Sequence, residues 1–229
     1  MIRDYYNLTK PGIIYGNALV AVAGFFFASK GTVDWWLLCA MLVGLSAIIA
    51  CGCVINNIFD RKIDAKMERT KKRAMVAGTI SQQRASLFAA ALGTLGIEVL
   101  WHYTNLLTLF VALAGLGIYV CLYTPLKPRS AMALFVGAAA GAVPPVVGYV
   151  AVTNTLDWFA GALFVALYLW QIPHFLAIAT YRYTEYTAAG VPLFIHKEPT
   201  EVAKKRGKKV FFYSLVVLLF FCAALMLHR

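Results

Sequence analysis

Residues 36–64 read WLLCAMLVGLSAIIACGCVINNIFDRKID, and this stretch decides what kind of fold the chain can adopt. The apolar run from Trp36 to Phe59 is long enough to cross the ~30 Å hydrocarbon core of a bilayer as a helix. Where the run leaves the membrane, Asn56, Asp60 and Asp64 follow one another at intervals of four residues. If the helix continues, the three side chains share one face, which predicts a polar, carboxylate-rich row at a membrane surface.

The composition extends the membrane assignment to the whole chain. Its 229 residues are 61% hydrophobic and 14% charged, with a mean hydropathy of +0.72. Such a composition excludes a soluble domain and predicts an all-α fold, a polytopic transmembrane helical bundle. Seven apolar segments of nearly membrane-spanning length are expected, at residues 12–29, 36–58, 85–101, 105–123, 131–152, 158–180 and 210–227.

The basic residues predict the orientation of this bundle. If the seven helices cross in order, nineteen of the 21 Lys and Arg fall on one side, and only Lys30 and Arg229 do not. The positive-inside rule makes that side, with the N-terminus, cytoplasmic. The net charge of +11 is then mainly a topology signal, to which anionic lipid can respond. Nucleic-acid binding is not supported, because the charge is split among loops beside apolar helices. The inner segments are residues 1–11, 59–84, 124–130 and 181–209.

The start of the 59–84 loop is the strongest candidate for chemistry. The amide of Asn56 and the carboxylates of Asp60 and Asp64 are oxygen ligands suited to Mg²⁺, which binds a few carboxylates together with substrate phosphates. Eight Lys and Arg follow between Arg61 and Arg84, as a polyanionic substrate would require. The alternative is a solvated loop that obeys the positive-inside rule, and it is favoured for each base taken singly. It does not explain the carboxylates, for which we favour a functional role.

Two further features remain open from the residues alone. In the 181–209 loop, Glu185 lies among three tyrosines and beside Arg182, as a second metal or phosphate contact or as part of an interfacial aromatic belt. Lys127, at the exit of the fourth predicted helix, would reach a phosphate or simply snorkel to the interface, and the second interpretation is favoured for the residue alone.

Prolines predict irregular helices in two places. Pro144 and Pro145 predict a broken or kinked fifth helix, which suits the wall of a cavity. Pro173 interrupts the hydrogen-bond ladder of the sixth helix next to His174, the only histidine inside a predicted span. This histidine would contact a porphyrin, exchange a proton or cap the kink, and the sequence leaves these roles open.

Several motifs resemble those of a known family, the intramembrane aromatic prenyltransferases. The row of Asn56, Asp60 and Asp64 resembles the first signature of that family, together with Arg69-Thr70 and Arg73. Tyr123-Thr124-Pro125-Leu126-Lys127 resembles the exit of its fourth helix. Three other stretches resemble the branch of the family that farnesylates haem. They are Leu8–Pro11, Trp170–Phe175 and Tyr186–Pro192. The resemblance as a whole runs from Leu8 to about Phe194.

The resemblance implies a fold and a reaction. It implies helices around a lipid-accessible cavity, and transfer of a farnesyl group from farnesyl diphosphate to a vinyl group of haem b, giving haem O, with Mg²⁺ required. It further implies a downstream haem A synthase or terminal oxidase assembly as a partner. One prenyltransferase domain over residues 1–229 is expected. Because members of the family usually have nine helices, the last two are expected to be absent from this chain.

The resemblance also implies roles for single residues. Catalysis and metal binding are implied for the first signature and for the acidic residue of the second loop. Binding of the diphosphate is implied for five bases, and binding of haem for three aromatic residues. The first group is Asn56, Asp60, Asp64 and Glu185; the second is Lys10, Arg69, Arg73, Lys127 and Arg182; the third is Tyr123, Trp170 and His174.

Other functions are compatible with parts of this pattern. Prenylation of another aromatic acceptor is opposed only by the stretch around His174. An ion-coupled transporter would place acidic residues near the bilayer midplane, whereas here they cluster at one face. A non-catalytic membrane scaffold would leave the spacing of Asn56, Asp60 and Asp64 unexplained.

Overall fold

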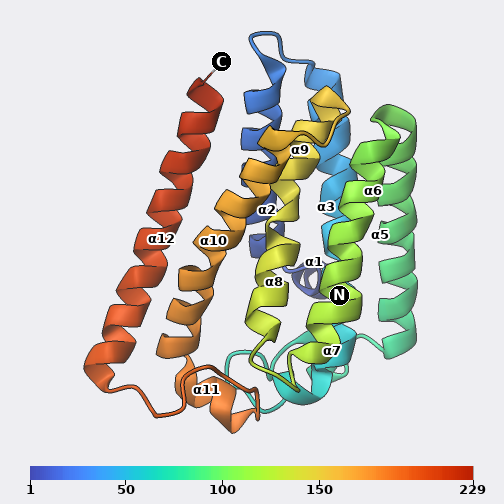
Figure 1. The fold of residues 1–229 in the computed structure, drawn as a ribbon. Helices are drawn as coiled ribbons and strands as arrows, with labels where there is room; N and C mark the ends of the chain where they lie inside the picture. Colours follow the sequence, from blue (N-terminus) through green and yellow to red (C-terminus); the bar gives the residue numbers. More distant parts are fainter. Residues whose placement is uncertain (229) are drawn as a thin grey trace.

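The computed structural model describes residues 1–228, and this part of the chain forms helices and loops without any β-strand (Figure 1). Arg229, one of the two bases predicted on the outer side, lies outside it. The elements are α1 (Ile2–Leu8), α2 (Pro11–Ser29), α3 (Trp35–Asp64), α4 (Ala74–Ala77), α5 (Gln82–Tyr103), α6 (Leu106–Gly117), the π-helix η1 (Ile118–Tyr123), α7 (Thr124–Leu126), α8 (Ala133–Gly141), α9 (Val143–Thr153), α10 (Trp158–Tyr181), α11 (Tyr183–Ala188) and α12 (Glu201–Leu227).

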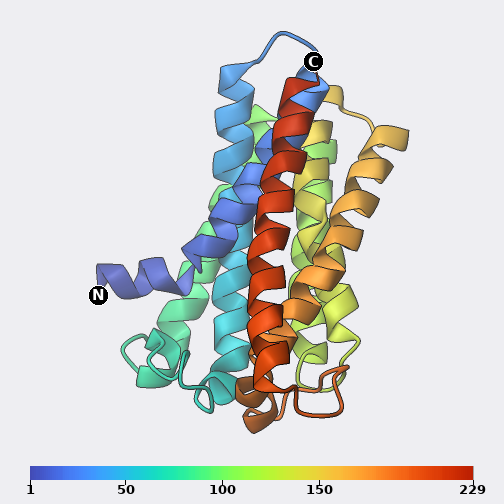
Figure 2. The ribbon, with the colours of Figure 1, turned by 90° about the vertical axis from the view of Figure 1, so that its left-hand side faces the viewer.

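Seven helical units between residues 1 and 228 are long and apolar enough to span a membrane, which confirms the predicted number. Two of them are composite: α6 continues through η1 and α7, and α8 and α9 together form one span. The units stand side by side, and the segments that contain α4, α7 and α11 gather at one end (Figure 1). The short α1 lies nearly across the direction of the other helices (Figure 2).

Short polar residues set the starts of most long helices. At each of these positions a side-chain oxygen accepts a hydrogen bond from a backbone N–H of the first turn, which satisfies a donor that the helix cannot pair. The helix boundaries therefore follow from local sequence. These residues are Asp34 for α3, Ser81 for α5, Asn105 for α6, Asp157 for α10 and Thr200 for α12.

Helix α3 is central and α12 is peripheral. In their most apolar windows, 67% of the α3 residues are buried inside the protein, against 11% for α12. Helix α3 continues without interruption to Asp64, beyond the predicted span of residues 36–58, which meets the condition for its polar side chains to share one face. Its last two turns are still packed by neighbouring segments. This position allows one rigid helix to carry polar side chains at the end of the bundle.

The backbones of α2 and α9 approach each other closely enough to exclude any side chain at two positions. A Cβ atom on Gly24 would lie 2.1 Å from the carbonyl oxygen of Pro145, and one on Gly148 would lie 1.9 Å from that of Ala21. Both glycines are helical, so their role is to permit contact between the two helices rather than to form a turn. Small residues serve this purpose in membrane bundles, where close van der Waals packing drives helix association.

The prolines act differently from one another. Pro144 and Pro145 accompany the predicted break, because α8 ends at Gly141 and α9 begins at Val143. By contrast, Pro173 lies inside α10, which continues to Tyr181, so the interruption predicted there does not end the helix. The packing of α10 on both sides of the proline stabilises the helix across the missing hydrogen bond.

Two further features differ from the sequence-based prediction. Helix α12 begins at Glu201 rather than near residue 210, so the basic run Lys204–Lys209 is part of the helix. The Thr200 cap starts the helix before the apolar segment begins. The π-helix η1 was not predicted, since hydrophobicity alone does not distinguish it from an α-helix.

The contact between α2 and α9 can be tested at Gly148. The Gly148→Ala variant is expected to lose about 1–3 kcal/mol of stability, because the added methyl group would force two backbones apart. Thermal unfolding in detergent measures the effect. Gly161→Ala is the matched control, since a Cβ atom there meets nothing within 4 Å. Equal unfolding temperatures for the two variants would contradict the close approach.

Candidate functional site

The last turns of α3 bury the three polar residues predicted to share one face. Asn56 is 1%, Asp60 2% and Asp64 3% exposed. A carboxylate buried to this extent requires a charged or hydrogen-bonded partner, because removal from water otherwise costs several kcal/mol. The partners of these side chains therefore define the site.

Each carboxylate is paired with a base from a different segment. The Nζ atom of Lys127, just beyond α7, lies 2.5 Å from Oδ2 of Asp60. The Nη1 atom of Arg73, just before α4, lies 2.6 Å from Oδ2 of Asp64. The fully buried hydroxyl of Thr70 donates to the backbone carbonyl of Asp64 at 2.9 Å, which folds the 59–84 loop back onto the end of α3.

Asn56 connects the N-terminal segment to the exit of the fourth span. Its Oδ1 atom accepts a hydrogen bond from Nζ of Lys10, and its Nδ2 atom donates to Oγ1 of Thr124 at 3.0 Å. Burial lowers the pKa of Lys10 to about 8, and the nearby positive charges of Arg73 and Lys127 act in the same direction. The free protein thus holds several bases close together, an arrangement that a polyanion would stabilise.

The neighbouring Asn57 fixes the position of this cluster. Its Nδ2 atom donates to the carbonyl of Leu8 at 2.7 Å, and its Oδ1 atom accepts from Nη1 of Arg73 at 3.2 Å. One buried amide thereby joins the end of α1, the helix α3 and the loop before α4. Lys10, which follows α1, has φ 54, a left-handed conformation that is unfavourable for a residue with a Cβ atom and that aims its side chain at Asn56.

Glu185 lies where the two charged loops meet. Its Oε2 atom is 3.3 Å from Nη1 of Arg182 and 3.8 Å from Nε of Arg69 in the other loop. The side chain is one-third exposed, so this group is more open to water than Asp60 or Asp64. The predicted acidic and basic residues of both loops therefore belong to the same end of the bundle.

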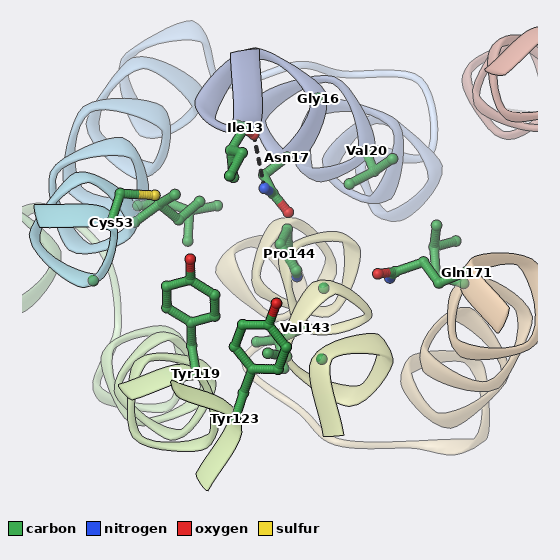
Figure 3. Close-up of a pocket in the computed structure, with 18 of the residues that line it drawn as sticks. Ile13, Gly16, Asn17, Val20, Cys53, Tyr119, Tyr123, Val143, Pro144 and Gln171 are labelled. Carbon is green, nitrogen blue, oxygen red and sulfur yellow. Dashed lines mark hydrogen bonds between the residues drawn. The ribbon is translucent and has the colours of Figure 1, made fainter. Parts of the chain in front are cut away.

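A cavity of about 600 Å³ begins directly beside this charged cluster. Its lining includes Ile13, Cys53 and Tyr123, which stand about one helical turn from Lys10, Asn56 and Lys127 in the chain. Most of the lining is apolar and comes from α2, α3, α6, η1, α8, α9, α10 and α12. A few polar groups point inward, among them the phenol hydroxyls of Tyr119 and Tyr123 and the amide of Gln171 (Figure 3).

The three residues predicted to contact haem all line this cavity. Trp170 and His174 lie on α10 with their rings stacked at a centroid distance of 4.8 Å. Tyr123 lies across the cavity on η1, stacked on Tyr119 at 5.3 Å. Aromatic groups from two different spans therefore line one cavity.

Four residues of the site received no role in the sequence-based prediction: Asn57, Thr124, Gln171 and Ser214. Gln171 is 6% exposed, and its side-chain amide forms no hydrogen bond within residues 1–228. A glutamine inside an apolar span is itself a signal of function, so this residue was detectable from the sequence. Ser214 gives no such signal, because a single serine in a membrane helix commonly bonds only to its own backbone.

These features define a class of polytopic membrane protein in which a buried cluster of acids and bases opens onto an apolar cavity between helices. The chain belongs to the UbiA prenyltransferase family, to which residues 17–229 match. It is an integral membrane protein of that family.

Individual relatives support the same assignment. The chain is 44% identical over 227 residues to "Protoheme IX farnesyltransferase 2" of Pseudomonas fluorescens, a match that covers 99% of this chain and 75% of the relative. It is also 44% identical over 226 residues to the protein of the same name from Chromobacterium violaceum, covering 98% of this chain and 73% of the relative. The solved structure of a UbiA homolog from Archaeoglobus fulgidus bound to DMAPP and Mg²⁺ has the same fold, with a TM-score of 0.73 at 18% identity over 99% of this chain and 78% of that one.

The buried pair of Lys127 and Asp60 yields a prediction about stability. Lys127→Met is expected to lower the free energy of unfolding by about 3–5 kcal/mol, because it leaves Asp60 charged and buried without its partner. The double variant Asp60→Asn with Lys127→Met should recover much of the loss. Lys66→Met, at an exposed position of the 59–84 loop, is the control for loss of a lysine. A Lys127→Met variant as stable as this control would contradict the proposed importance of the pair.

Proposed function

We propose that this chain transfers the farnesyl group of farnesyl diphosphate to a vinyl group of haem b, giving haem O and diphosphate. One observation carries the proposal: a buried row of Asn56, Asp60 and Asp64, surrounded by bases, stands at the mouth of an apolar cavity. A polar head with an apolar chain fits this arrangement, with the diphosphate at the bases and the prenyl chain in the cavity. The two relatives described above, with their printed name, support haem as the acceptor.

The donor set fits Mg²⁺ that arrives with a diphosphate. Between residues 1 and 228, no three His, Cys, Asp or Glu side chains gather closely enough to hold a metal by themselves. Mg²⁺ rarely needs such a cage, because it is usually bound by one or two carboxylates, water and substrate phosphates. We assign Asp60 and Asp64 as the main ligands, with Asn56 and Glu185 completing the metal and phosphate sites. When bound, the metal would stabilise negative charge on the departing diphosphate.

The ion pairs of the free protein suggest how the substrate is accommodated. Lys127 and Arg73 neutralise Asp60 and Asp64 in the absence of substrate. If Asp60 and Asp64 held the cation of an incoming diphosphate, each would exchange its base for it, and Lys127 and Arg73 would be left to bind phosphate oxygens. Every buried charge keeps a partner of opposite sign, so the exchange avoids an uncompensated intermediate. Lys10, Arg69 and Arg182 complete the set of bases proposed for the diphosphate.

The reaction itself requires protection of an allylic cation. The bond between C1 of the farnesyl group and the diphosphate oxygen breaks, and the terminal carbon of the haem vinyl group forms a new bond to C1. Water then adds to the remaining vinyl carbon and releases a proton, which leaves a hydroxyethylfarnesyl side chain. The apolar lining of the cavity limits premature capture of the cation by water. Tyr123, Trp170 and His174 supply the aromatic surface proposed for the porphyrin.

The assignment of the two aspartates can be tested by product analysis. Asp60→Asn and Asp64→Asn are each expected to reduce formation of farnesylated haem by about 100-fold or more, because stabilisation of the leaving group is worth several kcal/mol. Purified protein is supplied with haem b, farnesyl diphosphate and Mg²⁺, and the haem is analysed by mass spectrometry. Chelation of Mg²⁺ should abolish the wild-type product.

Glu98→Gln is the matched control for this test. Glu98 pairs with His102 at 3.1 Å near the end of α5, is 60% exposed and lies outside the proposed site. This variant should retain wild-type activity. Full activity in Asp60→Asn and Asp64→Asn would refute the metal–diphosphate assignment. A wild-type protein that prenylates a hydroxybenzoate or a chlorin but not haem would refute the choice of acceptor.

We also propose that the end of the bundle with the charged loops faces the cytoplasm, in the cytoplasmic membrane of a bacterium. The segment before α4 and the loop between α9 and α10 lie at opposite ends of the bundle (Figure 1). Lys71→Cys and Thr155→Cys place exposed thiols in these two segments. In a background with the five native cysteines replaced, a membrane-impermeant maleimide added to intact cells should label only the second variant. Labelling of Lys71→Cys alone would contradict the proposed topology and would mean that the positive-inside rule fails for this chain.

A further inference from the structure

The ring of His174 is held rigidly at the wall of the cavity. Trp170 stacks on it with a centroid distance of 4.8 Å and an interplanar angle of 23°. The ring of Phe211, from α12, lies 4.9 Å away. The residue is 9% exposed, so rotation of the imidazole would require neighbouring rings to move. The two ring nitrogens therefore have fixed and different surroundings.

The first nitrogen faces Ser214 on α12. The Nδ1 atom of His174 lies 2.7 Å from Oγ of Ser214, and that hydroxyl donates its single proton to the carbonyl of Phe211 at 2.7 Å. A hydroxyl whose proton is already used can only accept a second hydrogen bond. It follows that Nδ1 carries the proton of the neutral imidazole and donates to Ser214.

A second bond holds Ser214 itself in place. The indole Nε1 of Trp170 donates to the backbone carbonyl of Ser214 at 2.9 Å. The serine is thus fixed through its main chain by one aromatic residue of α10 and bonded through its side chain to another. This geometry leaves one tautomer in which all the hydrogen bonds are satisfied.

The second nitrogen is consequently an unprotonated acceptor. Nε2 has no hydrogen-bond partner among residues 1–228, and no fully enclosed side-chain nitrogen or oxygen in that range lacks one. Nε2 therefore keeps some accessible surface, and His174 lines the cavity from which a ligand could reach it. An unprotonated nitrogen cannot donate a hydrogen bond to a carboxylate such as a porphyrin propionate, whereas its lone pair suits a transition-metal ion.

We propose that Nε2 of His174 binds the iron of the haem acceptor and that Ser214 is the positioning residue that holds the ring in the required tautomer. This proposal rests on the proposed function, which makes haem the acceptor. Metal-bound imidazoles commonly donate their other N–H to a fixed oxygen, which orients the ring and raises its basicity as a ligand. Iron ligation would fix the porphyrin in the cavity, so that one vinyl group is presented to the prenyl chain.

The ligand role can be tested without turnover. Wild-type protein in lipid nanodiscs is titrated with ferric haem and with metal-free protoporphyrin IX. We expect tighter binding of haem, an imidazole-ligated absorption spectrum and, after reduction, an iron–histidine stretch in the resonance Raman spectrum. His174→Ala should remove these signatures and bind the two porphyrins equally, and added imidazole should restore the spectrum. An unchanged spectrum in His174→Ala, or a wild type without imidazole ligation, would overturn the ligand assignment.

The role of Ser214 needs a readout that a purely structural residue would not affect. Ser214→Ala should weaken ferric haem binding by about 10-fold, because loss of the partner of a metal-bound histidine typically costs that much. It should also shift the iron–histidine stretch, while the affinity for metal-free porphyrin stays unchanged. Ser214→Thr keeps a hydroxyl and should restore both values. A Ser214→Ala variant that matches the wild type in both measurements would overturn the positioning role.

The product assay and the spectra separate the ligation of iron by His174 from the farnesylation of haem. If the wild type makes farnesylated haem but shows no iron–histidine signature, the ligand inference is wrong while the proposed reaction stands. If haem is ligated by His174 but no haem is farnesylated in the product assay, the proposed reaction is wrong.

Discussion

Two carboxylates buried at the end of α3 impose the main constraint on this structure. Asp60 and Asp64 can remain charged there only because Lys127 and Arg73 are held within 2.6 Å of them. Those bases come from segments on either side of α5 and α6, so satisfying the two charges requires the 59–84 loop and the exit of the fourth span to pack on the same helix end. The arrangement of this end of the bundle therefore follows from the electrostatic needs of one helix.

The apolar part of the site depends on a different constraint, the contact between α2 and α9. Their glycines allow the two backbones to approach directly, which fixes α9 beside α2. The break between α8 and α9 lies at the cavity, whose lining includes Gly137 and Gly141 of α8. These glycines leave room for the side chains of Tyr123 and Gln171, which a Cβ atom at either position would meet. The cavity walls are rigid helices, as a site that must position two large substrates requires.

The cluster around His174 links the cavity to the most peripheral helix. Helix α12 has few buried residues, yet Phe211 and Ser214 of this helix define the orientation and the tautomer of a histidine on α10. A polar contact between membrane helices contributes only modestly to their association. The contacts of Ser214 therefore matter more for the orientation of His174 than for holding α12 in place. Helix α12 therefore contributes more contacts to the wall of the cavity than its small buried fraction suggests.

Much of this molecule could be predicted from the sequence because hydrophobicity and charge act locally. Runs of apolar residues specify the seven spans, the cap residues specify most of their starts, and the spacing of Asn56, Asp60 and Asp64 places them on one helix face wherever the helix lies. The partners of those residues depend on tertiary packing. Three features depend on residues 9 to 67 positions apart in the chain being brought within bonding distance. They are which base meets which carboxylate, how Asn57 joins three segments, and how Ser214 selects the tautomer of His174. No local pattern encodes such pairings, since they exist only after the helices have packed.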